Sequence, residues 1–417
     1  MPLRLPISSP VFLIAVVCTA QVLAQLGAFT FFALLPTFFG EWGLSHSQAG
    51  ILNGIIFGAY ALAVPFIVPL TDRIDPRRIY ICAVGLTTCS HLGMAFLADG
   101  FWDGFLYRAL AGIGWGGTYM VGLKALADLV EGPAQSRAVA FHAASIGVGG
   151  SLSFVLAGWA ADSMSWQAAF QVSAAGSFLA LLVMAFMVPG RKPVPMDDHG
   201  GFSALIRALK NKSAIAYSLG YLVHTWEMFT LRSWVVTFLV FTAAQGGGPP
   251  NFLIPTVVAM FMELTGTASS VIGNEIAIRV GRRRWILMVM FASMATGAVV
   301  GFAAGGGYGV AATVCLIYNI LIYADSASLT AGAVGTAEPG RRGATLAVHG
   351  MLGYGGGFVG PLFLGVILDF LGGETVINWG IAFAHVSVIM VIGPLAIKLL
   401  KPGELPGDKA GTGGGKI

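Results

Sequence analysis

The sequence predicts an all-α integral membrane protein with twelve transmembrane helices in two pseudo-symmetric six-helix bundles. The composition is the first reason: 56% of the residues are hydrophobic, 10% are charged, and the mean hydropathy is +0.80. A soluble domain carries about 25% charged residues. The second reason is that successive apolar runs reach the roughly 20 residues that cross a bilayer. The third is an internal repeat.

The repeat joins the two halves of the chain. Residues 349–369 match residues 142–162, and paired residues such as His142 and His349 are separated by 349 − 142 = 207 positions, about half of 417. The basic loops at 71–78 and 278–284 repeat at nearly the same spacing. Internal repeats in a membrane chain are typical of transporters, whose halves rock about a shared midplane site.

The apolar runs and their flanking charges place twelve helices. The predicted ranges are 11–38, 47–70, 79–98, 102–127, 137–161, 165–189, 213–242, 251–277, 285–304, 308–334, 342–369 and 375–399. Of the 23 Lys and Arg residues, all but Arg108, Lys124 and Arg232 fall at the two termini or in alternate loops. By the positive-inside rule, those loops and both termini are cytoplasmic, in a multi-pass protein of the cell inner membrane.

The repeat and the loops also predict the domains. Residues 1–190 form an N-terminal bundle, and residues 213–400 form a C-terminal bundle. Between them, residues 191–212 are a cytoplasmic linker with a short amphipathic helix. Residues 401–417 are expected to be a disordered cytoplasmic tail.

Three motifs resemble those of the major facilitator superfamily. The loop after the second span, VPLTDRIDPRR, keeps Leu70, Asp72, Arg73 and Arg77 of the family pattern GxLxDRxGRR, with Val68 and Asp75 in place of its glycines. The later loop, NEIAIRVGRRR, keeps Arg279, Gly281, Arg282 and Arg283, with Ile278 where the acid would be. The fourth span, RALAGIGWGG, is similar to RxxxGxGxxx and keeps Arg108, Gly112, Gly114 and Gly117. The eleventh span has a glycine-proline pair, Gly360 and Pro361, which the family normally carries in the fifth.

The resemblance implies a cytoplasmic gate in these loops. Asp72 at a helix end would accept hydrogen bonds from neighbouring arginines or from a helix amino end. The predicted gate residues are Asp72, Arg73, Arg77, Arg279 and Arg283. The alternative is that the arginines only set the topology.

Ionisable residues inside the apolar runs predict the working site, because a charge at the midplane costs roughly 2.5 to 3.5 kcal/mol. They are Arg108, Lys124, Glu227, Arg232, Glu263 and Asp325, together with His91 and His224. The resemblance implies that spans one, four, seven and ten line a central cavity, and these hold all of the charges except Glu263. Three of these residues also have a purely structural explanation. Lys124 would extend its amino group to the membrane surface. Glu263 would be a hydrogen-bonded acid between packed helices, and His91 would be a core histidine whose hydrogen bonds are satisfied.

The predicted substrate and proton cavity combines these charges with neighbouring polar and aromatic side chains. Its residues are Arg108, Glu227, Arg232, Asp325, Lys124, Gln25, Trp115, Tyr119, Trp226, Tyr318 and Asn319. Glu227 and Arg232 lie about 140° apart on one helix, so they are expected to pair elsewhere, with Arg108 and Asp325 as candidates. Glu227 or Asp325 is expected to carry a proton, since burial and a nearby arginine shift a carboxyl pKa in opposite directions.

These features predict a secondary active transporter that moves a small solute by alternating access, coupled to protons. Three cavity cations against two acids, Glu227 and Asp325, favour a small organic or inorganic anion, provided that Lys124 faces the cavity. A proton-driven drug or metabolite efflux pump and a transport-dead receptor of the same fold are the alternatives. The expected partners are the solute, protons and the lipid bilayer, with no nucleic acid, for a protein that acts as a monomer.

Catalytic, cofactor and metal signatures are missing from the sequence. It has no HExxH, no GxSxG and no GxxxxGK[ST], which argues against an enzyme or an ATP-driven pump. The four cysteines lie in apolar runs without a CxxC pair, so neither a metal nor a cofactor is expected.

We predict that Asp72→Asn leaves expression intact and slows transport, because it removes the carboxylate of the gate. The initial uptake rate into vesicles, normalised to the amount of protein, measures the effect. An unchanged rate would leave the arginines with only a topological role.

Overall fold

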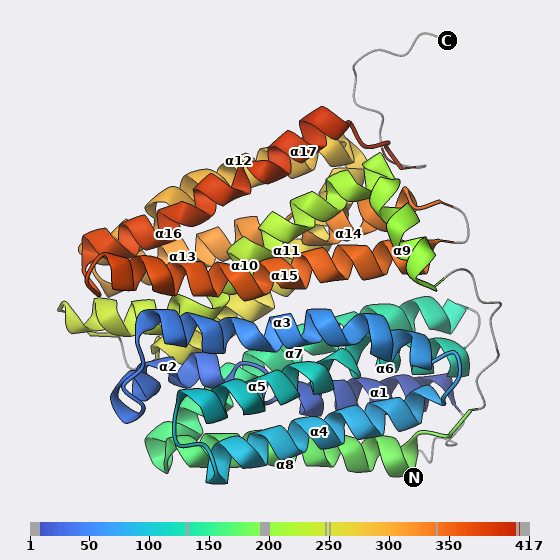
Figure 1. Cartoon of the computed structure of the whole chain (residues 1–417), viewed down its shortest axis with the longest axis horizontal. Coiled ribbons are helices and arrows are strands. Elements are labelled where there is room, and N and C mark those ends of the chain that lie inside the picture. The colour runs from blue at the N-terminus through green and yellow to red at the C-terminus, as the bar shows by residue number, and fades with distance from the viewer. Residues whose placement is uncertain are drawn as a thin grey trace. The chain divides into compact units, whose positions relative to one another are not determined.

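The computed structural model describes residues 9–130, 133–191, 201–246, 248–249, 252–338, 341–405 and 408, and these are helical apart from short connections. The chain divides into two compact units (Figure 1). The first comprises Met1–Leu44 and Ile55–Asp197, and the second Ser45–Gly54 and Asp198–Ile417. The domain boundaries expected from the sequence stay predictions.

The first unit consists of long helices that run roughly parallel to one another (Figure 1). They are α1 (Pro10–Gln25), α2 (Thr30–Glu41), the part of α3 (His46–Leu70) from Ile55 onward, α4 (Pro76–Phe96), α5 (Phe101–Gly116), α6 (Tyr119–Leu129), α7 (Pro133–Ser163) and α8 (Trp166–Met187). Its core lies where α1, α4, α6 and α8 meet, around buried Tyr80, Val84, Val121 and Met184.

The second unit holds the remaining helices and the first residues of α3. They are α9 (Gly201–Lys210), α10 (Lys212–Ala244), α11 (Pro255–Val280), α12 (Arg282–Val300), the 3₁₀ turn η1 (Gly301–Gly306), α13 (Tyr308–Tyr323), α14 (Ser326–Gly335), α15 (Arg342–Phe370), α16 (Val376–Met390) and α17 (Ile392–Leu400). α10 is the central helix and packs most extensively on α15. α9 occupies the stretch in which the sequence predicts an amphipathic helix.

Side-chain caps explain where several helices begin. Ser9, Asp75, Ser165, Asn211 and Thr375 each accept a hydrogen bond from a backbone N–H in the first turn of the helix that follows. These residue types are favoured at this position because helix starts leave N–H groups without an intrahelical partner. Local sequence therefore fixes these boundaries.

Glycines allow α10 and α15 to pack backbone against backbone. A Cβ atom at Gly356 would collide with the carbonyl oxygen of Leu222, and one at Gly360 would collide with Thr230. Small residues are used in this way between membrane helices because van der Waals packing, not water exclusion, drives their association.

Four predicted spans are broken, one of them between α16 and α17, and at the other three breaks side chains bind the freed backbone groups. Between α1 and α2, the N–H of Phe29 donates to Ser153 Oγ at 3.0 Å. Between α5 and α6, Thr118 Oγ1 donates to the carbonyl of Trp115 at 2.8 Å. Between α13 and α14, Trp285 Nε1 donates to the carbonyl of Ala324 at 2.9 Å. A helix can break at membrane depth only when its backbone is satisfied in this way.

The sequence repeat recurs in the environments of its histidines. His142 is buried and stacks on Tyr119 with 5.4 Å between ring centroids, and His349 is buried and stacks on Tyr221 at 4.0 Å. Asp369, at the end of the repeat, accepts hydrogen bonds at the amino end of α3 from the backbone N–H groups of His46 and Ser47, at 3.0 and 2.8 Å.

The predicted all-helical membrane fold is confirmed. Within the described residues, eleven single or broken helices are long and apolar enough to cross a membrane. The remaining predicted span, the fourth (102–127), which α5 and α6 form, is not among them. It carries Arg108 and Lys124 and breaks at Gly117, and both features lower its apolar character.

We predict that Gly356→Ala destabilises the protein, because the added methyl group would press on the backbone of α10. Overpacking of this kind costs about 1–3 kcal/mol, so the melting temperature in detergent should fall. Gly355→Ala is the matched control, because no atom lies within 4 Å of a Cβ built there. Equal melting temperatures for the two variants would contradict the close packing of α10 on α15.

Candidate functional site

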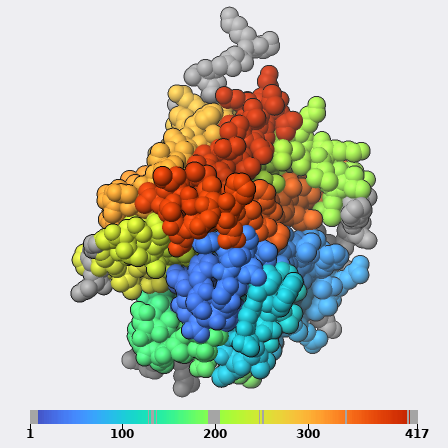
Figure 2. All heavy atoms as spheres, turned by 60° about the vertical axis from the view of Figure 1, so that its left-hand side comes forward, coloured from blue at the N-terminus to red at the C-terminus, as the bar shows by residue number. Residues whose placement is uncertain are grey.

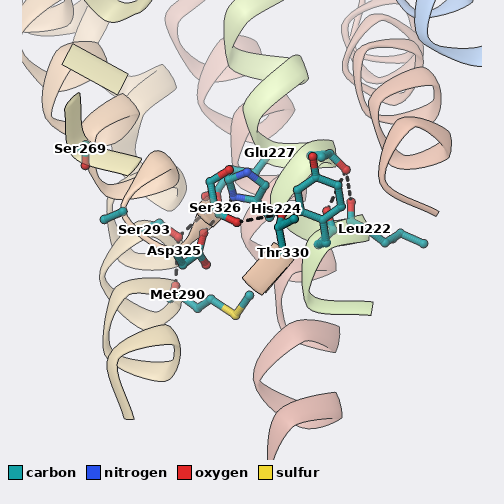
Figure 3. A network of polar contacts seen from close by, with 12 residues as sticks. Leu222, His224, Glu227, Ser269, Met290, Ser293, Asp325, Ser326 and Thr330 are labelled. Atoms are coloured by element: carbon teal, nitrogen blue, oxygen red, sulfur yellow. Dashed lines mark hydrogen bonds and ion pairs between the residues drawn. The ribbon is translucent and has the colours of Figure 1, made fainter. Parts of the chain in front are cut away.

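Buried charged and polar groups of the second unit gather at the break between α13 and α14. His224 and Glu227 come from α10, Ser293 from α12, and Asp325 lies at the break itself (Figure 3). All four side chains are buried. A membrane interior tolerates such groups only when they are paired, hydrogen-bonded or neutralised by protonation.

Asp325 and His224 form a buried pair. Asp325 Oδ1 lies 2.9 Å from His224 Nδ1, and the two side chains are 3% and 1% exposed. The break in the span places the carboxylate there, since Asp325 directly precedes the first residue of α14. One proton on either partner gives a pair with no net charge, whereas a pair without that proton carries one uncompensated negative charge.

Glu227 lies one turn further along α10 and belongs to the same cluster. Ser293 Oγ donates to Glu227 Oε2 at 3.3 Å, and Tyr318 of α13 lies beside the carboxylate. Asp325 of the same cluster is also close enough to interact with this carboxyl group electrostatically. Burial without a cation favours its protonated form.

Arg232 and Glu263 form the second charged pair of this unit and join α10 to α11. Arg232 Nε lies 2.5 Å from Glu263 Oε1, and the side chains are 10% and 5% exposed. The guanidinium also lies over the rings of Phe229 at 5.1 Å and Tyr323 at 5.6 Å. Removing one member of such a pair leaves a buried charge, which costs about 3–5 kcal/mol.

Two histidines and a tyrosine extend this cluster toward the start of α10. Tyr221 stacks on His224 at 5.5 Å and on His349 at 4.0 Å. His349 in turn lies 3.2 Å from Ser218 Oγ and 3.3 Å from Thr330 Oγ1. The sequence analysis missed these contacts. Their signal was the spacing of Ser218, Tyr221, His224 and Glu227 every three residues, which makes consecutive members neighbours on a helix.

The first unit buries one arginine among aromatic rings. Arg108 of α5 is 4% exposed, and its Cζ lies 4.3 Å from the ring centroid of Phe31 and 5.1 Å from that of Phe32. The faces of aromatic rings carry partial negative charge, so they stabilise a guanidinium that has left water. Both phenylalanines belong to α2, directly after the break that follows α1.

A small cavity lies beside the helix breaks of the same unit. It is lined by Gln25 at the end of α1, by Trp115 and Thr118 at the break between α5 and α6, and by Thr87 and His91 of α4. Its volume of about 20 Å³ is room for one water molecule. His91, interpreted from the sequence as a core histidine, packs against Gly27 and lines this cavity.

The remaining predicted cavity residues have other neighbours. Lys124 pairs with Asp128 on its own helix at 3.0 Å and is partly exposed. Tyr119 stacks on His142. Trp226 Nε1 donates to His385 Nε2 of α16 at 3.1 Å. Because Asp128 neutralises Lys124, this lysine no longer adds to the excess of cavity cations from which the sequence predicted an anionic solute.

Asn319 links two helices close to the acidic cluster. Its Nδ2 donates to the carbonyl of Met262 at 2.6 Å, next to Glu263 in α11. Asn319 directly follows Tyr318 in α13. Tyr318 and Asn319 are therefore the two predicted polar wall residues that lie next to buried acids.

The first predicted gate loop folds around Asp75 and Arg77. Asp75 caps α4 through the N–H of Arg77 and also accepts from the N–H of Arg191 at 3.2 Å. Arg77 donates to the carbonyls of Met184, at 3.1 Å, and Ala185 at the end of α8. Asp75, which replaces a family glycine, thus joins the start of α4 to the residue Arg191, a contact that the sequence did not predict.

The remaining predicted gate residues differ in burial and in their position in the loops. Asp72 is partly buried at the end of α3, and Arg73 is exposed. Arg279 is exposed in the last turn of α11, and Arg283 is partly buried. Arg282 is the buried arginine of this second loop. Within the described ranges, no group of three His, Cys, Asp or Glu side chains is placed to hold a metal ion.

Comparisons with known proteins agree with this architecture. The chain is 27% identical over 236 residues to Protein spinster homolog 3 of Danio rerio, covering 54% of this chain and 47% of that protein. It is 22% identical over 286 residues to Protein spinster homolog 1 of Homo sapiens, covering 65% and 54%. The chain thus spans about half the length of these relatives.

A solved structure shares the fold. It is that of a bacterial homolog to the human lysosomal transporter spinster, in an inward-facing and occupied conformation. The TM-score is 0.73 at 15% identity, over 94% of this chain and 96% of that one. The family model described as Major Facilitator Superfamily matches residues 17–361. This multi-pass membrane chain therefore belongs to the Major Facilitator Superfamily.

Proposed function

We propose that this chain is a proton-coupled secondary transporter of a small organic solute, working by alternating access. The observation that carries the proposal is the clustering of Glu227, Asp325 and His224 at the break between α13 and α14. Buried ionisable groups at a helix break are costly, and in membrane proteins they mark solute or proton sites.

Asp325 and Glu227 take the proton-carrying role in this proposal. Among the described residues, the membrane-spanning helices of the second unit bury three acids, Glu227, Glu263 and Asp325, and Arg232 is bound to Glu263. Glu227 and Asp325 are left with His224 and hydroxyl groups as neighbours. One or more protons on this trio would remove the excess negative charge, and a change of hydration during the cycle would release them.

Arg108 anchors an anionic group of the solute. Its guanidinium offers several donors in one plane, which suits a carboxylate better than a point charge would. Gln25 and Trp115, which line the small cavity of the same unit, supply further hydrogen-bonding and aromatic surface. The proposed solute is therefore a small organic anion with an apolar part.

The acidic excess of the second unit favours one other candidate, efflux of lipophilic cations. In that case Glu227 and Asp325 would bind the positive charge of the solute when they are not protonated. The same experiments separate the two candidates, because they predict stabilising ligands of opposite charge.

In this proposal the protein works as a monomer in an inner membrane, with both termini in the cytoplasm. The positive-inside distribution of Lys and Arg supports that orientation. The loop around Asp72, Arg73 and Arg77, with Arg279 and Arg283 in the second half, forms the cytoplasmic gate.

We predict that small organic anions raise the melting temperature of the purified protein and that Arg108→Gln weakens their binding. Hydrogen bonds to charged groups contribute about 1.5–3 kcal/mol, which corresponds to roughly a ten- to hundredfold loss of affinity. Thermal shift titrations with anionic, cationic and neutral compounds at pH 5.5 and 7.5 measure it. Arg232→Gln is the comparison, because that arginine is already neutralised by Glu263.

Two results would count against the anion. Stabilisation by lipophilic cations alone would select the efflux candidate. Binding without any flux in vesicles would indicate a receptor that has kept the transporter fold.

We predict that Asp325→Asn and Glu227→Gln together abolish the acceleration of uptake by an inward proton gradient. The double variant has no titratable carboxyl group beside His224 or Ser293, so uptake should become independent of the gradient while counterflow exchange persists. Proteoliposome uptake with and without a pH step measures the difference. Gradient-driven uptake retained by the double variant would place proton coupling elsewhere.

A further inference from the structure

The described residues that follow α17, 401–405 and Asp408, lie against the second unit. Lys401 ends α17 in a left-handed conformation, with φ 46° and ψ 61°, and Pro402 follows. Such a residue stops a helix and turns the chain, and proline cannot continue the helix. In the space-filling view, the red end of the chain lies against the light-green start of α10 (Figure 2). We call residues 401–405 together with Asp408 the clasp segment.

Asp408 makes the principal contact of the clasp segment. Its two carboxylate oxygens accept from Arg282 Nε and Nη2, each at 2.9 Å. Arg282 and Asp408 are both only 3% exposed. A bidentate pair of this kind is both strong and geometrically specific.

Arg282 also binds two other helices of the unit. Its Nη1 donates to Asn274 Oδ1 of α11 at 2.9 Å and to the carbonyl of Ser328 in α14 at 3.3 Å. The guanidinium therefore holds α11, α12 and α14 together at one end, and Asp408 neutralises its charge. Without Asp408, the arginine would be a buried cation with only neutral partners among these contacts.

Three further contacts fix the clasp segment to α10 and α14. Tyr217 Oη donates to the carbonyl of Gly403 at 3.2 Å, and the N–H of Gly403 donates to Ser213 Oγ at 3.1 Å. The side chain of Leu405 packs directly on Gly335, where a Cβ atom would collide with it. The segment thus touches the ends of α10, α12 and α14.

The second basic loop explains why a carboxylate is needed at this point. The first loop, TDRIDPRR, contains its own acids, Asp72 and Asp75, whereas the repeat-related loop, IRVGRRR, has none. In the first unit, Asp75 accepts from the N–H of Arg77 in the same loop and from that of Arg191, 116 residues away. In the second unit, Asp408 supplies a carboxylate to Arg282 from 126 residues further along the chain, and Glu404 of the same segment also lies near Arg282 and Arg283.

We propose that the clasp segment is a built-in conformational lock. While Asp408 is bound to Arg282, the ends of α10, α11, α12 and α14 are held together, and the segment must undock for this end of the unit to rearrange. The requirement that the segment undocks during the cycle rests on the proposed transport function. Docking through the Asp408–Arg282 pair does not depend on that function.

Docking is tested by a double-mutant cycle on the full chain. Asp408→Asn and Arg282→Gln should each lower the melting temperature by several degrees, and the double variant should fall no further than Arg282→Gln alone, because both changes remove one interaction. Amide hydrogen exchange in α14 should also accelerate. Glu338→Gln is the control, since it breaks an exposed pair with Arg341 in the same unit. Additive shifts, or exchange in α14 equal to that of the control, would overturn the lock.

Undocking is tested with a reversible cross-link. Ser213→Cys with Gly403→Cys, in a background without Cys18, Cys82, Cys89 and Cys315, should form a disulfide on oxidation. Uptake should then fall at least severalfold and return after reduction, while each single-cysteine variant is unaffected. Full uptake by the cross-linked protein would show that the segment stays docked throughout the cycle, and the lock would be wrong. Loss of all flux in the reduced protein, with the melting and exchange effects intact, would instead count against the transport proposal alone.

Discussion

The cost of leaving a polar group unsatisfied in hydrocarbon governs this structure. Water is not available there to bind a free backbone N–H or to solvate a charge. A broken span is therefore possible only where a neighbouring side chain binds the freed backbone groups, as Ser153 and Trp285 do. The same condition explains why the buried charges cluster, since each of them needs a partner or a proton.

The breaks link this constraint to function. A continuous helix presents only side chains to a cavity, whereas a break also places a residue such as Asp325 at the start of a new helix. Gln25, Trp115 and Asp325, all selected from the sequence as candidate site residues, lie at or next to three of the mid-span breaks. Their positions agree with a site near the middle of the membrane, where transporters commonly interrupt their helices.

The charged pairs divide the buried ionisable residues into two kinds. Arg232 and Glu263 neutralise each other, as do Arg282 and Asp408, so these pairs are suited to holding helices together. Glu227 and the pair of Asp325 with His224 lack a permanent cation, so their charge depends on protonation. This difference separates the groups proposed to hold the unit from those proposed to work in the transport cycle.

The sequence by itself determined the fold class, the internal repeat and the family, because hydropathy, periodic small residues and loop charges act locally along the chain. Its motifs identified the superfamily now shown by the match over residues 17–361. It also selected nearly every buried charge, since a charged residue in an apolar run stands out in one dimension.

Only the tertiary structure decided which charged side chains pair with each other. Nothing in the spacing showed that Arg232 meets Glu263, that His224 meets Asp325, or that Lys124 stays with Asp128 on its own helix. Asp408 is the clearest case: the sequence placed it in a tail expected to be disordered, yet its carboxylate is buried on Arg282. Residues 409–417 of that tail lie outside the described part of the chain. Such pairings depend on how helices far apart in the sequence are packed, and that packing is a property of the whole unit.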